Sequence, residues 1–252
     1  MKNTANDDAR NRLIFALDVG GGTGPAFEWV DRLQGHVGLF KVGKESFTAC
    51  GPDLVTGILK RGGKVFLDLK FHDIPNTVGA AASAAVKLGV SMFNVHALGG
   101  EAMLKETADA ARRTAEKLGG PAPVVLAVTV LTSLDDGDLQ RLGFRFGAGE
   151  LALHLAEMAK LAGVSGVVAS ARDAAAIRER CGKDFLIVTP GIRGAAKPAD
   201  DQKRTLSPRD AVRMGADYIV VGRPIRTAAD PVAEADAIAA EIAGGLSARG
   251  LG

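Results

Sequence analysis

The sequence has little cysteine. Cys50 and Cys181 are the only two in 252 residues, and they lie far apart along the chain. Two cysteines so spaced make neither the disulfide framework of a small secreted domain nor a zinc-ligand pattern. We therefore expect two ordinary thiols in a reducing compartment.

Long apolar runs are also missing. The longest, residues 124–131, is interrupted by Thr129 and is far too short to span a bilayer. Residues 1–10 are polar and lack the apolar stretch of a signal peptide. We expect a cytoplasmic protein that does not associate with a membrane.

An excess of charge of one sign is absent too. The net charge is +2 and the two signs are interspersed, which gives no basic stripe of the kind that nucleic-acid-binding proteins carry. The four histidines show no metal-ligand spacing. Neither a nucleic-acid partner nor a bound metal is expected.

What the sequence has is a repeated alternation of short β-rich runs and alanine-rich amphipathic segments. Strands are expected at residues 13–17, 37–42, 64–69, 92–96, 124–130, 166–169, 185–189 and 218–221. Helices are expected at residues 26–33, 52–60, 78–88, 102–118, 150–161, 171–180, 208–214 and 231–243. The strands read as continuous apolar runs, as do strands buried on both faces.

Eight strand–helix repeats in about 250 residues are typical of a (β/α)8 TIM barrel, and a doubly wound open sheet is the alternative. No linker divides the chain, so we expect one α/β domain over residues 1–252, with a flexible N-terminal segment at 1–11. The glycine run at residues 20–24 lacks dinucleotide-binding spacing and is expected to form a flexible loop.

One decapeptide, residues 68–77 (DLKFHDIPNT), carries an unusual group of charges. Alternate residues of a strand share a face, so Asp68 and Lys70 would point the same way, with Asp73 in the loop beyond. Charged groups seldom gather at the end of an apolar strand unless they are paired or functional. A structural ion pair that stabilises the loop is the alternative interpretation.

Other predicted strands also end in polar residues, and in a TIM barrel the chemistry lies at the C-terminal ends of the strands. Besides Asp68 and Lys70, these residues are Asp18, Lys41, Asn94, His96, Thr132, Ser133, Arg193 and Arg223. Their shared location favours an active site over scattered ion pairs.

The loops after the last two strands predict a phosphate site, which is where barrels usually bind phosphate. Glycine at 191 and 222 lets the backbone approach a ligand, and Arg193 and Arg223 can bind phosphate bidentately. The loop at residues 191–206 is long enough to act as a lid, with Gln202 and Arg193 as its reaching groups.

These motifs together resemble the orotidine 5'-phosphate decarboxylase family. The resemblance rests on ALD at 16–18, KVG at 41–43, the decapeptide, VTVLTS at 128–133, TPGIR at 189–193 and VGRPI at 221–225. It implies a cofactor-independent TIM-barrel homodimer that converts orotidine 5'-monophosphate (OMP) to UMP and CO2, the last step of de novo UMP synthesis.

The resemblance also implies residue roles. Lys70 would donate the proton to C6, flanked by Asp68 and by Asp73 of the partner subunit, with Lys41 completing the charge network. The ribose would be bound by Asp18, Lys41 and the partner-derived Asp73 and Thr77. Thr132 would contact the pyrimidine. The phosphate would be bound by Arg193, Gln202, Gly222 and Arg223.

The chemistry agrees with these residue types. Loss of CO2 leaves a carbanion at C6 that the ring delocalises poorly, and no thiamine or pyridoxal motif offers an electron sink. A fixed ammonium at C6 stabilises that charge directly. A Mg²⁺-dependent sugar-phosphate decarboxylase of the same barrel type, a Schiff-base aldolase and a non-catalytic nucleotide-binding homologue are the alternatives.

Overall fold

The structure, a computed structural model, describes residues 4–192 and 206–250. Its strands are β1 (Leu13–Ala16), β2 (Leu39–Gly43), β3 (Val65–Phe71), β4 (Met92–His96), β5 (Val124–Val128), β6 (Gly166–Val168), β7 (Leu186–Pro190) and β8 (Tyr218–Val221). Its helices are α1 (Thr4–Asn11), α2 (Thr23–Leu33), α3 (Lys44–Cys50), α4 (Pro52–Lys60), α5 (Pro75–Lys87), η1 (Ala97–Gly99), α6 (Gly100–Leu118), α7 (Asp136–Arg141), α8 (Ala148–Leu161), α9 (Ala174–Cys181), α10 (Pro208–Arg213), α11 (Arg223–Arg226) and α12 (Pro231–Ala248).

The strands run in chain order, β1 to β8, in a closed barrel. Their apolar side chains are buried, as expected for strands covered on both faces; Ile14, Phe93 and Ile187 are 0% exposed. The predicted (β/α)8 fold is confirmed. All eight predicted strands are present, with ends within two residues of the prediction.

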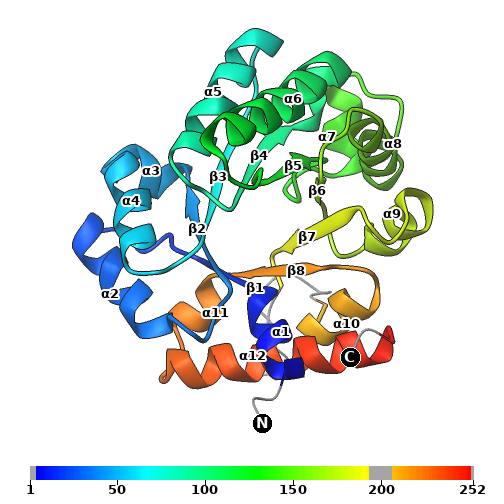
Figure 1. Cartoon of the computed structure of the whole chain (residues 1–252). Helices are drawn as coiled ribbons and strands as arrows, with labels where there is room; N and C mark the ends of the chain where they lie inside the picture. Colours follow the sequence, from blue (N-terminus) through cyan, green and yellow to red (C-terminus); the bar gives the residue numbers. More distant parts are fainter. Residues whose placement is uncertain (1–3, 193–205, 251–252) are drawn as a thin grey trace. The chain divides into compact units, whose positions relative to one another are not determined.

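The chain divides into two compact units. Unit 1 comprises Met1–Asp68 and Thr189–Gly252. In it, β1 pairs in parallel with β2 and with β8, and β2 pairs with β3 as far as Gly43 opposite Asp68. Figure 1 shows the long helix α12, in red, running beside α1 and α10, and these helices are in contact.

Unit 2 comprises Leu69–Val188. Its strands β4, β5, β6 and β7 pair in parallel in that order. Helices α5 and α6 pack closely (Figure 1), and the Thr114 hydroxyl donates to the Ser83 hydroxyl over 3.0 Å between them. The prediction of one domain over 1–252 stays a prediction.

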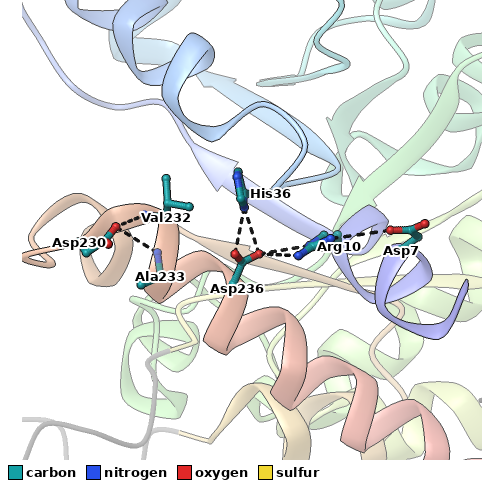
Figure 2. A network of polar contacts seen from close by, with 7 residues as sticks. All are labelled: Asp7, Arg10, His36, Asp230, Val232, Ala233 and Asp236. Carbon is teal, nitrogen blue, oxygen red and sulfur yellow. Dashed lines mark hydrogen bonds and ion pairs between the residues drawn. The ribbon is translucent and has the colours of Figure 1, made fainter. Parts of the chain in front are cut away.

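The N-terminal segment differs from its prediction. Thr4–Asn11 form helix α1 rather than a flexible segment, and Ala9 is fully buried. Arg10 donates from Nε and a terminal nitrogen to Asp236 Oδ1 on α12, and His36 Nδ1 lies 3.0 Å from the same oxygen (Figure 2). These polar contacts bind α1 to distant parts of the chain, and no apolar period in the segment reveals them.

The glycine run also differs in part. Gly20, Gly21 and Gly22 all have positive φ, between 67° and 88°, a conformation that other residues adopt only at a cost. The loop ends there, because α2 begins at Thr23 and already contains Gly24. In the described part of the chain, no helix is both long and apolar enough to cross a membrane.

Candidate active site

The structure brings three of the predicted residues of unit 1 together around one ammonium group. Lys41 on β2 places Nζ 3.2 Å from Asp18 Oδ2 and 3.3 Å from Asp68 Oδ2. The Lys41 side chain is 11% exposed and that of Asp68 is 13% exposed, while Asp18 is more open at 39%. The two carboxylates pair with the Lys41 ammonium and so offset the cost of enclosing it away from water.

The backbone around this ion-pair cluster leaves little room for change. A Cβ at Gly43, the last residue of β2, would lie 2.7 Å from Asp18 Oδ1 and 3.0 Å from Lys41 Nζ. The buried Ser46 hydroxyl donates to the Leu17 carbonyl over 2.8 Å and so secures the chain just before Asp18. A side chain at position 43 would therefore displace the ends of the Asp18 and Lys41 side chains from their present contact.

Helix α11 is hydrogen-bonded to the main chain of Asp18. Its first residue, Arg223, is exposed, and Gly222 precedes it as the N-terminal cap. A Cβ at Gly222 would lie 3.1 Å from that of Ala16 on β1, so the loop approaches the strand closely. Arg226, at the end of α11, donates to the Asp18 carbonyl. The predicted phosphate residues 222 and 223 are therefore joined to Asp18 through this short helix.

Lys70, in unit 2, is held in a different way. It lies near the end of β3 with φ of 52°, and no other non-glycine residue in the described part of the chain has a positive φ. Its N–H donates to Asn94 Oδ1 over 2.8 Å. Regular alternation along β3 therefore ends before Lys70, and the strand pleat alone does not set the direction of its side chain.

The loop and helix after β3 carry the next two predicted residues. Asp73 and Thr77 are both exposed, and Asp73 Oδ1 accepts the Ile74 N–H over 2.7 Å. Ile74, between them, is 67% exposed although it is a large apolar residue. Thr132 and Ser133 lie in the turn after β5 and are exposed as well.

Two predicted phosphate residues, Arg193 and Gln202, lie outside the described residues, together with most of the predicted lid at 191–206. Gly191 and Ile192 at its start are described; Gly191 has φ of 76° and Ile192 is buried.

Sequence reasoning missed three residues that support the site: Ser46, Asn94 as an acceptor, and Arg226. Only Asn94 carried a signal, as a buried amide in an apolar strand, and its partner could not be read from the sequence. Within the described ranges, no group of three or more histidine, cysteine or acidic side chains could hold a metal ion.

Comparisons with known proteins agree with this geometry. The model of the family described as Orotidine 5'-phosphate decarboxylase / HUMPS family matches residues 11–238. The chain is 62% identical over 249 residues to the orotidine 5'-phosphate decarboxylase of Syntrophus aciditrophicus, covering 98% of this chain and 99% of that one. It is 54% identical over 235 residues to that of Moorella thermoacetica, covering 93% of each chain.

Solved structures give the same result. The crystal structure of orotidine 5'-phosphate decarboxylase from Lactobacillus acidophilus matches with a TM-score of 0.80 and 40% identity, covering 91% of this chain and 97% of that one. From the matched length and the full-length relatives, the chain belongs to the Orotidine 5'-phosphate decarboxylase / HUMPS family.

Proposed function

We propose that the chain decarboxylates OMP to UMP and CO2, in the last step of de novo UMP synthesis. The observation that carries this proposal is the ion-pair cluster of Asp18, Lys41 and Asp68, with Lys70 following on β3, in a chain whose relatives bear the name of that activity. An enzyme with this activity is a carbon–carbon lyase of the carboxy-lyase type.

Lys70 is the proposed proton donor. As CO2 leaves, an electron pair remains at C6 of the pyrimidine, and a positioned ammonium stabilises that charge more in the transition state than in the substrate. The same ammonium then transfers a proton to C6 to give UMP. The strained backbone at Lys70 fits this role, because such strain gathers at functional sites.

Asp68 and Lys41 are the proposed electrostatic partners of Lys70. The cluster of two carboxylates and one ammonium has a formal charge of −1, and a second ammonium would neutralise it. The net negative charge of the cluster would attract the Lys70 ammonium. Asp18 is the most exposed member, which suits a carboxylate that binds ribose hydroxyls beside Lys41.

Phosphate binding is assigned to Gly222 and Arg223, with Arg193 and Gln202 of the lid. Arg223 is exposed and free to reach a ligand phosphate, and a guanidinium binds phosphate through paired hydrogen bonds. The contact from Arg226 to Asp18 connects this region to the ribose end of the site. Thr132 is assigned to the pyrimidine.

A homodimer with shared sites is part of the proposal. Asp73 and Thr77 would be contributed across the interface, and the exposure of Ile74 and Leu98 (67% and 41%) supports an apolar contact around them. Mixing Asp73→Ala protein with Lys70→Ala protein should restore activity in the mixed dimers. Mixed dimers without activity would contradict the shared site.

We further propose that the protein works in the cytoplasm and needs no cofactor. Both cysteines are free, and burial raises the pKa of the Cys181 thiol, which suits an unreactive residue in a reducing compartment.

The test of the function is direct. EDTA-treated protein is mixed with OMP, the loss of ultraviolet absorbance is followed, and UMP is identified by mass. Rapid metal-free conversion is expected. Tight UMP binding without conversion would instead indicate a non-catalytic homologue, and turnover only of sugar phosphates with Mg²⁺ would indicate the other decarboxylase type.

A further inference from the structure

The backbone conformation of Lys70 is unfavourable, and the proposed reaction does not explain what stabilises it. Its φ of 52° is the only positive value at a non-glycine residue in the described ranges. A side chain with a Cβ is unfavourable in that region, and lysine lacks the short polar group by which asparagine or aspartate compensates locally. Some neighbour must therefore stabilise this conformation.

Asn94 provides that support. Its Oδ1 accepts the Lys70 N–H over 2.8 Å, and the residue is 0% exposed between the equally buried Phe93 and Val95 on β4. Burying an amide in an apolar strand is costly unless it is hydrogen-bonded, and asparagine is a poor strand former. The position thus retains a polar group where packing alone favours an apolar one.

A second contact extends the first. The rings of His72 and His96 stack with their centroids 5.3 Å apart and their planes 21° apart. His72 follows Lys70 by two residues, and His96 follows Asn94 by two on β4. Two alternate residues of β4, Asn94 and His96, therefore contact two alternate residues at and just beyond the end of β3, Lys70 and His72.

We propose that Asn94 is a positioning residue for the decarboxylation: its amide oxygen holds Lys70 in the left-handed conformation and so fixes where the ammonium is presented. This proposal rests on the proposed role of Lys70. Asn94 needs no contact with the nucleotide, since it acts through the backbone of residue 70. A loss of this hydrogen bond should therefore impair the proton transfer rather than the binding of the nucleotide.

The test compares Asn94→Leu, which replaces the amide oxygen and nitrogen by methyl groups on the same branched frame, with Asn94→Asp, which keeps an acceptor oxygen in either protonation state. Thr129→Val is the matched control. Thr129 is also 0% exposed in unit 2, and its hydroxyl donates to the Val168 carbonyl over 3.1 Å rather than to β3. Activity on OMP, UMP affinity and hydrogen exchange of the Lys70 amide are measured for each.

Asn94→Leu should lower kcat at least roughly 100-fold with UMP affinity within about threefold of the wild type, and should speed exchange of the Lys70 amide. Asn94→Asp should recover at least a tenth of the wild-type kcat. Thr129→Val should change kcat less than about threefold, even if its thermal stability falls as much as that of Asn94→Leu. Together these results would support the positioning role.

Three results would overturn it: a near-normal kcat in Asn94→Leu, an equal fall in Thr129→Val, or a parallel loss of UMP affinity. If Asn94→Leu does not fold, Asn94→Asp decides: the exchange rate of the Lys70 amide must stay near wild type, and kcat must stay at or above a tenth of the wild-type value. Failure of the underlying function would look different, because wild-type protein would then not convert OMP, or Lys70→Ala would convert it normally.

Discussion

The two lysines of the proposed site are held by different means. Lys41 lies in regular strand, and its ammonium is fixed by two carboxylates 3.2 and 3.3 Å away. Lys70 is fixed through its main chain, by a left-handed φ and a hydrogen bond to a buried asparagine. Changes around Lys41 should therefore alter charge, whereas changes around Lys70 should alter geometry, and the two kinds of damage can be told apart in the kinetics.

The largest effect is expected from removing the Lys70 ammonium. Lys70→Ala should lose turnover by 10³-fold or more, roughly the combined scale of lost proton transfer and lost electrostatic stabilisation. UMP should still bind, because other groups hold the ribose and the phosphate. Steady-state kinetics with OMP and titration with UMP measure both, and near-normal turnover would remove Lys70 from the mechanism.

The two carboxylates that pair with Lys41 should differ in their effects on catalysis. Asp68→Asn should lower kcat by about 10²-fold, since it removes charge beside the proposed proton donor. Asp18→Asn should chiefly raise KM, by about tenfold, the scale of one lost hydrogen bond to a charged group. Separate kcat and KM values for OMP check the distinction; identical profiles for the two variants would speak against separate roles.

The phosphate end should show its effect only when phosphate is present. Arg223→Ala should reduce kcat/KM for OMP by roughly 10²-fold, because a charge-assisted, bidentate contact is lost. For orotidine, which lacks the phosphate, the loss should be much smaller. Equal losses on both substrates would contradict the phosphate assignment.

The smallest effect is expected away from the site, in a polar network that stabilises the fold and has no proposed part in the reaction (Figure 2). Burial tends to raise the pKa of Asp236, but hydrogen bonds from His36 and Arg10 outweigh it and lower that pKa below its ordinary value of 3.8. A carboxylate with a lowered folded-state pKa stabilises the fold above its unfolded pKa, and the contribution is lost as pH falls through the folded pKa.

Asp236→Asn should therefore reduce the free energy of unfolding by up to about 1 kcal/mol at neutral pH, a value kept small by solvent exposure. The difference from wild type should shrink as the pH falls below 3.8, the ordinary value of this pKa. Denaturant melts across pH measure it, with Asp7→Asn as the control, because Asp7 lies 3.7 Å from Arg10 and is 53% exposed. A pH-independent difference would rule out the ionic origin.

The sequence predicts the Lys41 side of this comparison better than the Lys70 side. Strand periodicity and the ends of apolar runs locate Asp18, Lys41 and Asp68, because one strand end lies beside the next in a parallel barrel. Neither the sign of φ at Lys70 nor the hydrogen bond of its N–H to Asn94 can be read from a local pattern, because the two residues lie 24 positions apart in the sequence.

Contacts between residues far apart in the sequence also explain why α1, α11 and the role of Arg226 were not predicted. Helix α1 depends on contacts of Arg10 with Asp236, 226 residues away, and α11 is only four residues long. Neither has enough apolar periodicity of its own to be recognised. Arg226 reads as a surface arginine until the fold brings it to the Asp18 carbonyl.

The left-handed backbone at Lys70 is tested most directly by comparing the free energies of unfolding of Lys70→Gly and Lys70→Ala. At an ordinary strand position, such as Val124 on β5, alanine should be the more stable of the two by about 0.5–1 kcal/mol. At position 70 the order should reverse, with glycine more stable by about 1 kcal/mol, because glycine adopts a positive φ without strain. If alanine is the more stable residue at position 70 as well, Lys70 is not held in the strained conformation and the comparison between the two lysines fails.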